Sequence, residues 1–304
     1  MRYSILRPDL AWLLTRTEIV RFILCFIVWN FLEEDNSSQI LQLVHKKGII
    51  PIVGNMLDSS RDIRITAKEK GTNMSKASQS ILSDFCELVK TSKVFGGKTP
   101  KALSLKILAL ALLDSVVKGL RSAGWVGNCL SPKLLQKLVK ALEPLQATVD
   151  IEKRKQVDPL FIGLPVSILE SHSIGSLDSH EIQLPCECLD TLANIVPGIM
   201  QLEKGDFKPI QLLILRLHIN LTNRRPSICD VFSKPTVIST LVSITNSKFM
   251  SLGGFLEEEE RLVQLDMLVL SLALMINFAE MSDSARLRFV EGLQPPFTII
   301  LIIF

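Results

Sequence analysis

One helical unit recurs at three places along the chain. In the clearest copy, residues 212–244, a long apolar stretch ends near Asn220, a polar link follows, and a short amphipathic stretch closes at Phe232. A later copy places Asn277 ahead of Phe289 by the same interval. Helical units that recur in this way are typical of solenoids, in which each unit stacks on its neighbours. The recurrence therefore predicts an all-α chain built from stacked helices.

A third copy lies near the start of the chain and has Asn30 as its landmark. Asn30 precedes Val44 as Asn220 precedes Phe232, with two extra residues in the link. Apolar residues then follow at the same spacing, at Ile49, Ile50 and Val53 after Val44 and at Val237, Ile238 and Leu241 after Phe232. Asn194 occupies a similar place in a degenerate fourth copy. Each clear copy predicts a long helix, a short amphipathic helix and a third helix.

Composition fits a packed helical chain. Apolar residues make up 47% of its 304 residues and the mean hydropathy is +0.32, which excludes general disorder. Aromatic residues are only 6%, as expected where helices stack through aliphatic side chains rather than around a cofactor. The net charge of +3 is too small to indicate nucleic-acid binding. The six cysteines are scattered, which favours a reducing compartment.

The repeats suggest where the domain begins and ends. We expect a helical-repeat domain over residues 10–293, with repeats at about 10–58, 75–150, 186–250 and 257–293. Residues 157–185 mix Pro, Gly, Ser and His without a sustained period, which predicts a long inter-repeat loop. The last residues, 294–304, form an atypical apolar tail. A solenoid needs a polar cap, so this tail predicts a truncated end.

The first apolar stretch, residues 10–31, has some features of a membrane anchor. Arg16, Glu18 and Arg21 interrupt it and leave an uncharged run, residues 22–32, that is too short to span a bilayer. We therefore expect a buried helix in the first repeat and no membrane attachment.

A basic helix is predicted from Ser131 to about Thr148, because Ser131 is a good cap and Pro132 suits a first turn. Its apolar face consists of Leu134, Leu135, Leu138, Val139, Leu142 and Leu145. The opposite face carries Lys133, Lys137 and Lys140, and Lys153, Arg154 and Lys155 follow shortly after. These six cations form the strongest basic patch in the chain. The patch is either a solvated helix face or a contact for an acidic partner surface or nucleic acid.

No spacing in the chain predicts an active site. The segment SKVFGGKT ends like a phosphate-binding loop, but it has Ser92 where a glycine is needed and follows a predicted helix rather than a strand. A possible zinc set, His172, His180, Cys186 and Cys188, matches no known ligand spacing. We therefore predict no catalytic residue, no metal, no cofactor and no small-molecule substrate.

The landmark asparagines Asn30, Asn220 and Asn277 remain as candidates for partner binding. An amide both donates and accepts, so asparagines at one place in successive repeats can line a groove and bind the backbone of an extended peptide. Alternatively, each asparagine ties the end of its own helix to the adjacent link. The sequence leaves both interpretations open.

The unit LxxNL(T/A), followed by a polar link, an amphipathic turn and GIIPIVGNML, resembles the armadillo repeat. We therefore expect an armadillo/HEAT-like right-handed helical solenoid. A closer likeness is carried by SLKILALALLDSVVKGLRSAG, RLHINLTNRRPSICDVF and LVLSLALMINFAEMSDSARLRFV. These segments look like the fungal form of the conserved carboxy-terminal domain of the Wapl (wings apart-like) family, cohesin release factors. The likeness spans most of residues 10–293.

This resemblance implies a nuclear, chromatin-associated protein without enzymatic activity. Such a protein would bind cohesin through its SMC ATPase heads, its kleisin and the HEAT-repeat regulatory subunits, and would help the ring to leave DNA. The chain lacks the FGF tripeptides that animal relatives use for cohesin contact. Direct DNA contact by the basic patch stays open.

A second interpretation is an armadillo-type scaffold or transport adaptor with another partner. Such adaptors pair each repeated asparagine with a tryptophan one turn away. Here the tryptophans are Trp12, Trp29 and Trp125, and the two clearest later repeats have none. This counts against cargo binding of the importin kind.

Overall fold

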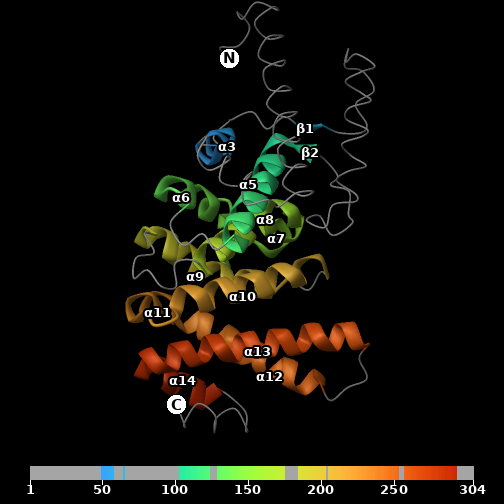
Figure 1. The fold of residues 1–304 in the computed structure, drawn as a ribbon. Helices are drawn as coiled ribbons and strands as arrows, with labels where there is room; N and C mark the ends of the chain where they lie inside the picture. Colours follow the sequence, from blue (N-terminus) through green and yellow to red (C-terminus); the bar gives the residue numbers. More distant parts are fainter. Residues whose placement is uncertain are drawn as a thin grey trace, which may run out of the picture. The chain divides into compact units, whose positions relative to one another are not determined.

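A computed structural model describes residues 49–57, 64–65, 103–123, 129–174, 184–202, 205–252 and 257–292 (Figure 1). Over these ranges the chain is helical apart from one pair of two-residue strands, so the predicted all-α class is confirmed. The chain divides into two compact units, Met1–Gly124 and Trp125–Phe304. Asn30, the apolar stretch at 10–31, the segment that begins at Ser92 and the tail at 294–304 lie outside the described residues.

In the first unit, α3 (Ile49–Leu57) packs against α5 (Leu105–Ser122). The strands β1 (Arg64–Ile65) and β2 (Leu103–Ser104) pair antiparallel, with Arg64 opposite Ser104. Helix α5 is buried on several sides, as its broad apolar pattern indicates; its side chains below 5% exposure include Ile107, Ala109, Leu110, Leu113, Val116 and Val117.

The second unit is built from helices only. In chain order these are α6 (Pro132–Lys140), the 3-10 turn η2 (Glu143–Leu145), α7 (Ile151–Gln156), α8 (Pro159–Ile174), α9 (Cys186–Met200), the 3-10 turn η3 (Gly205–Phe207), α10 (Lys208–Thr222), α11 (Pro226–Phe232), α12 (Pro235–Leu252), α13 (Glu258–Met281) and α14 (Asp283–Gly292).

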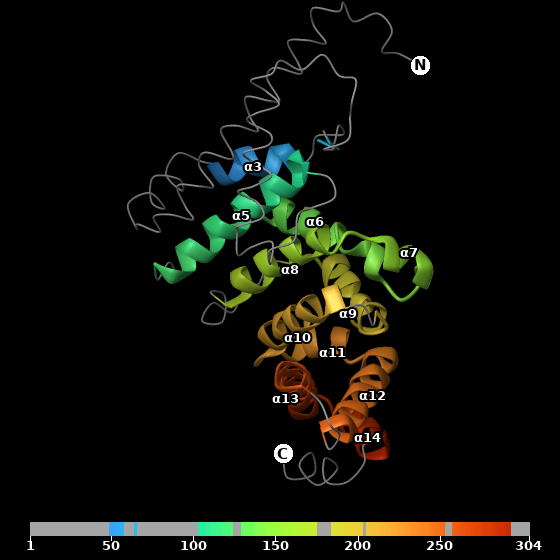
Figure 2. The same cartoon turned by 90° about the vertical axis from the view of Figure 1, so that its right-hand side faces the viewer.

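These helices form two rows that pack against each other. One row runs α8, α10, α13, and the other runs α6, α9, α12, α14, with each helix in contact with the next in its row (Figure 2). Contacts between the rows join α6 to α8, α9 to α10 and α12 to α13. The short helix α11 contacts α9, α10 and α13. The hydrophobic core of the unit therefore lies between the two rows.

The recurring unit has the helices that the sequence predicts. Helix α10 ends at Thr222, α11 closes with Phe232 and α12 begins at Pro235. In the later copy, α13 ends at Met281 and α14 carries Phe289. The two landmark phenylalanines have no exposed surface. Each phenylalanine is therefore a core residue of the short helix that follows a long one.

The predicted loop over residues 157–185 is wrong in its first half, because α8 occupies Pro159–Ile174. Most of this helix is buried on all sides, including Ile162, Leu164, Val166 and Ile168. A helix packed between neighbours shows no amphipathic period, so the periodicity that reveals surface helices is missing here. Pro165 and Gly163, which suggest a loop, lie inside the helix.

The predicted helix from Ser131 to about Thr148 is also too long. Helix α6 ends at Lys140, and a 3-10 turn follows. Pro144 explains the break, since it has no N–H to donate to the carbonyl of Lys140 and its ring would collide with that carbonyl. The predicted apolar face is nevertheless correct, and Leu142 and Leu145 are fully buried.

Candidate interaction surface

The side chain of Asn277 joins two helices of one row. Its Nδ2 donates to the backbone oxygen of Ile219 at 3.2 Å and to Oγ1 of Thr222 at 2.9 Å. Asn277 lies near the carboxyl end of α13, and both acceptors lie near the carboxyl end of α10. The asparagine thus ties its helix to the preceding repeat, which neither sequence interpretation anticipates.

Asn220 makes the matching connection one step earlier in the row. Its Nδ2 donates to Oγ of Ser173 at 3.1 Å, and this hydroxyl in turn donates to the backbone oxygen of Glu170 at 2.6 Å. Each of the two asparagines therefore uses its N–H groups inside the chain. Partner binding by Asn30, Asn220 and Asn277 stays a prediction.

The opposite ends of α10 and α13 are also joined, by an ion pair between Lys208 and Glu260 at 3.3 Å. Because both amino ends and both carboxyl ends meet, the two helices run parallel.

The proposed fourth landmark, Asn194, lies elsewhere. It belongs to α9 in the other row, where its Oδ1 accepts from Nζ of Lys234 at 3.3 Å and its backbone oxygen accepts from the N–H of Ala147 at 3.3 Å. Asn277 donates to Thr222, two residues after Asn220, and Asn220 donates to Ser173. By the same two-residue offset, the residue of α8 that corresponds to Asn220 is Ser171. The sequence pointed to Asn194 instead, because residues 157–185 were predicted to form a loop.

His218 of α10 and Cys229 of α11 are buried near the asparagine contacts. His218 has no exposed surface; its Nδ1 lies 2.7 Å from the oxygen of Ile214, its Nε2 lies 3.0 Å from the oxygen of Leu192, and burial lowers its pKa. Its ring packs on Phe232 with centroids 4.8 Å apart. Cys229 donates from Sγ to the oxygen of Thr222 at 3.3 Å. The neutral ring carries one N–H and so donates to one of its two carbonyls, and the thiol donates to a third. These buried contacts suit a structural role.

The lysines of α6 form the exposed part of the predicted basic patch. Ser131 caps the helix by accepting from the N–H of Leu134 at 3.3 Å, as its sequence predicts. Lys133 and Lys140 are exposed and Lys137 is half-buried. Because the leucines of α6 are buried on the other side, these three lysines share one outward face.

Arg154 does not belong to this patch, which corrects the sequence interpretation. Only 3% of it is exposed. Its Nε donates to the oxygen of Val149 at 3.0 Å, its Nη2 donates to Oε1 of Gln201 at 2.9 Å, and its Nη1 donates to the oxygen of Gly198. A guanidinium offers five N–H donors in a fixed geometry, so it can bond to these three acceptors at once, on the segment before α7 and at the end of α9.

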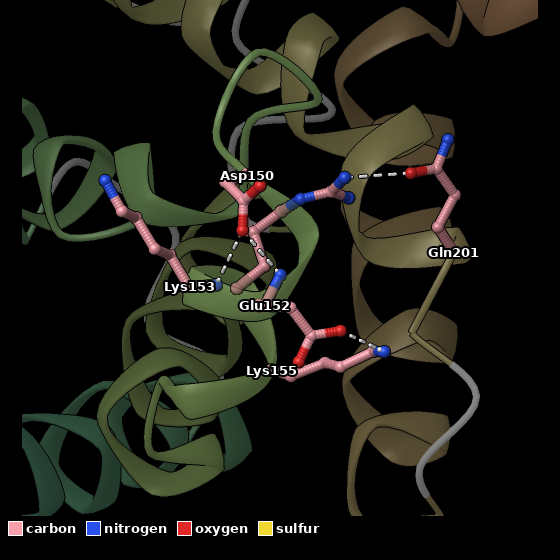
Figure 3. A network of polar contacts seen from close by, with 6 residues as sticks. Asp150, Glu152, Lys153, Lys155 and Gln201 are labelled. Atoms are coloured by element: carbon pink, nitrogen blue, oxygen red, sulfur yellow. Dashed lines mark hydrogen bonds and ion pairs between the residues drawn. The ribbon is translucent and has the colours of Figure 1, made fainter.

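The neighbours of Arg154 in α7 differ from one another. Lys155 pairs with Glu152 at 2.7 Å, which neutralises much of its charge locally. Lys153 is exposed and points away from Gln201 (Figure 3). The basic patch is therefore reduced to the three lysines of α6 together with Lys153.

Close backbone packing holds the segment before α7 against α9. A Cβ at Gly198 would collide with the backbone of Leu145 and Ala147. The N–H of Ala147 bonds to the backbone oxygen of Asn194 at the same place. With the donors of Arg154, these contacts fix where α6 and α7 lie, and hence where their lysines are presented.

The residues considered for metal or nucleotide chemistry are dispersed. Cys188 is buried and Cys186 is exposed on α9, while Nδ1 of His172 lies 3.8 Å from Sγ of Cys129. Within the described ranges, no group of three or more His, Cys, Asp or Glu is placed to hold a metal ion, and His180 lies outside them. The buried carboxylate Asp114 lies inside helix α5 and pairs with Lys118 at 2.7 Å.

Comparison with known protein families gives one match, to the family described as WAPL, wings apart-like protein regulation of heterochromatin. The match covers residues 14–285, which include all three landmark asparagines and the basic helix. No curated protein and no solved structure matches the chain. Since the family match extends over most of the sequence and confirms the resemblance carried by its helical motifs, the chain belongs to the wings apart-like family.

Proposed function

We propose that this chain is a non-enzymatic regulator of sister-chromatid cohesion that binds cohesin and promotes its release from chromatin in the nucleus. The observation that carries the proposal is the family match over residues 14–285. The expected partners are the SMC heads, the kleisin and the HEAT-repeat regulatory subunits of cohesin. No small molecule and no membrane are required.

The proposed architecture is a right-handed solenoid of armadillo/HEAT-like repeats. Successive long helices of one row are joined in the same way, and this supports the proposal: Asn220 ties α10 to α8, and Asn277 ties α13 to α10. In solenoids each repeat contacts only its neighbours. We expect removal of residues 257–304 to leave the preceding helices folded, which circular dichroism of the shortened chain would test.

The proposed contact for an acidic cohesin surface is the lysine face of α6. Its three lysines carry charge on a helix that is held rigidly by buried leucines and by the Arg154 contacts. A rigid basic face favours fast, oriented association with an acidic partner.

A pull-down of the full chain with reconstituted cohesin, with and without its HEAT-repeat regulators, tests the proposal. The wild-type chain should bind saturably, and changing Lys133, Lys137 and Lys140 to Glu should abolish binding. The matched control changes the same net charge at exposed sites elsewhere, Arg216, Arg224 and Arg288 to Glu. Equal loss in both variants would argue against the α6 site. Absence of binding by well-folded wild-type chain would favour an armadillo-type scaffold with a different partner.

A further inference from the structure

Helix α13 exposes an apolar stripe on its outer face. The stripe consists of Leu262, Leu265 and Val269, which are 58%, 44% and 53% exposed. Their spacing of three and four residues places them in one line along the helix. Grouped apolar side chains of this kind on a folded surface indicate an interaction site.

The stripe is separate from the contacts that hold the fold together. The buried side chains of α13 include Met267, Leu268, Leu274, Met275 and Phe278, and they lie on the opposite side of the helix. Helix α13 packs against α10, α12 and α14, and its bonds to α10 come from Asn277 and Glu260 rather than from the stripe. Removing the stripe therefore leaves the core intact, and its apolar character needs another explanation.

Negative charge surrounds the stripe. Helix α13 and its N-cap carry exposed carboxylates at Glu257, Glu258, Glu259, Glu260, Asp266 and Glu280, against one exposed cation, Arg261. The favourable helix dipole accounts for carboxylates in the first turn. Asp266 lies in the middle of the helix, one turn from both Leu262 and Val269, where the dipole gives no such benefit. The stripe is thus an apolar line with an acidic border.

We propose that this stripe is a docking site for an amphipathic helix of another protein, one with apolar residues at the same spacing and Lys or Arg on either side. Helices commonly bind apolar surfaces through anchors at positions i, i+3 and i+7. Basic flanks would pair with Glu258, Glu259 and Asp266 and would select against acidic helices. The proposal does not depend on the cohesin-release role.

The acidic border disfavours two other occupants. Helix α13 is long and apolar enough to cross a membrane, but core helices of soluble proteins share this length and composition. Membrane surfaces are anionic and attract basic segments, so the carboxylates oppose binding to them. In a symmetric dimer the same patch would face itself, and Asp266 would approach the Asp266 of the other copy. A basic helix satisfies the apolar stripe and its border together.

Two fluorescent designed peptides of about 20 residues test the proposal. Both carry leucines at i, i+3 and i+7, and they differ only in having Lys or Glu flanks. The full chain should bind the Lys peptide saturably and the Glu peptide at least about tenfold more weakly. Changing Leu265 and Val269 to Asp should lower affinity for the Lys peptide at least about tenfold. The matched control is Leu287→Asp on α14, where the leucine is 65% exposed but outside the stripe, and it should bind as wild type.

A charge swap makes the test independent of folding. Changing Glu259 and Asp266 to Lys should weaken binding of the Lys peptide and create binding of the Glu peptide. Four outcomes would overturn the proposal: no binding of the Lys peptide, equal binding by the Leu265/Val269 variant with unchanged circular dichroism, a stripe-dependent dimer in light scattering, or stripe-dependent binding to phosphatidylserine vesicles. Since neither peptide contains a cohesin sequence, each result stands apart from the cohesin pull-down.

Discussion

Nδ2 of Asn277 lies 2.9 Å from Oγ1 of Thr222, and this contact joins the carboxyl ends of two parallel helices from successive repeats. Thr222 has no exposed surface and its hydroxyl donates to the oxygen of His218 at 2.8 Å. The hydroxyl of Thr222 therefore donates to one backbone carbonyl and accepts a hydrogen bond from the amide of Asn277.

Changing Asn277 to Ala should lower the free energy of unfolding by about 1–3 kcal/mol, because the oxygen of Ile219 and the hydroxyl of Thr222 both lose a donor. Asn277→Asp should have a similar effect, since a carboxylate has the same shape but cannot donate. Urea unfolding measures both. Asn223→Ala, at an exposed site beyond the end of α10, is the control. Equal stability of the Asn277 and Asn223 variants would contradict the assigned role.

Arg154→Met should destabilise the second unit by about 3 kcal/mol, because the oxygens of Val149 and Gly198 would be left without these donors in a buried site. Arg154→Lys should recover only part of the loss, since an ammonium group cannot reproduce the forked geometry that reaches all three acceptors. Thermal unfolding of both variants checks this. The exposed neighbour provides the control, because Lys153→Met removes the same charge and should change stability by less than about 0.5 kcal/mol.

Gly198→Ala should be more disruptive than its size suggests. The added Cβ would meet the backbone of Leu145 and Ala147, which cannot rotate away as a side chain can. We expect a loss of about 2 kcal/mol or more in the free energy of unfolding. Gly205→Ala is a suitable comparison, because a Cβ there meets nothing within 4 Å. A folded Gly198→Ala chain as stable as Gly205→Ala would show that α9 and the 145–147 segment are not in close contact.

We expect the free energy of unfolding to decrease as the pH is lowered, because of His218. Burial lowers its folded-state pKa from the ordinary value of 6.5, so the folded state holds the ring neutral. As pH falls below about 6.5, the unfolded chain takes up a proton that the folded chain does not, and the free energy of unfolding decreases until the folded-state pKa is passed. Urea unfolding between pH 7.5 and pH 5 should show this decrease. His218→Gln should be less stable at pH 7.5 but should show a shallower dependence on pH; an unchanged slope would exclude His218 as the cause.

Cys229 should resist alkylation in the folded chain. Burial, with smaller contributions from Asp230 and Glu280, raises its pKa to about 12, so the thiolate is about one part in 10⁵ at pH 7. Exposed Cys186 should react much faster with a maleimide, and peptide mass mapping would separate the two. In urea the rates should become similar. Fast modification of Cys229 without urea would mean that the packing between α10 and α11 opens readily.

The sequence predicted the elements that carry a clear amphipathic pattern and clear helix boundaries. The long helix that carries Asn220, the short helix that closes at Phe232, the helix that begins at Pro235 and the cap at Ser131 are all confirmed. Helix α8 was missed because a helix buried on all sides has no period, and its proline and glycine suggest a loop. The end of α6 was missed because Pro144 was not weighed as a helix breaker.

The candidate site was less predictable than the fold. The outward face of Lys133, Lys137 and Lys140 follows from helical spacing alone. The burial of Arg154 does not, because its acceptors at Gly198 and Gln201 come from a distant part of the chain. The hydrogen-bond partners of Asn220 and Asn277 could not be predicted either, because local spacing does not show which helix packs alongside. The stripe on α13 could not be predicted either, because this helix has apolar residues on its buried and on its exposed side and the sequence does not show which side is covered.

The asparagine contacts also bear on how such a chain tolerates insertions. The tie from Asn277 to Ile219 and Thr222 sets the offset between two successive long helices, and the link after each asparagine takes no part in it. A link can therefore lengthen without moving one helix along the other. In the sequence, the interval from Asn30 to Val44 is two residues longer than the interval from Asn220 to Phe232. By contrast, inserting a single residue inside α10 or α13 would rotate the amide away from its acceptors by about 100° and displace the buried face with it.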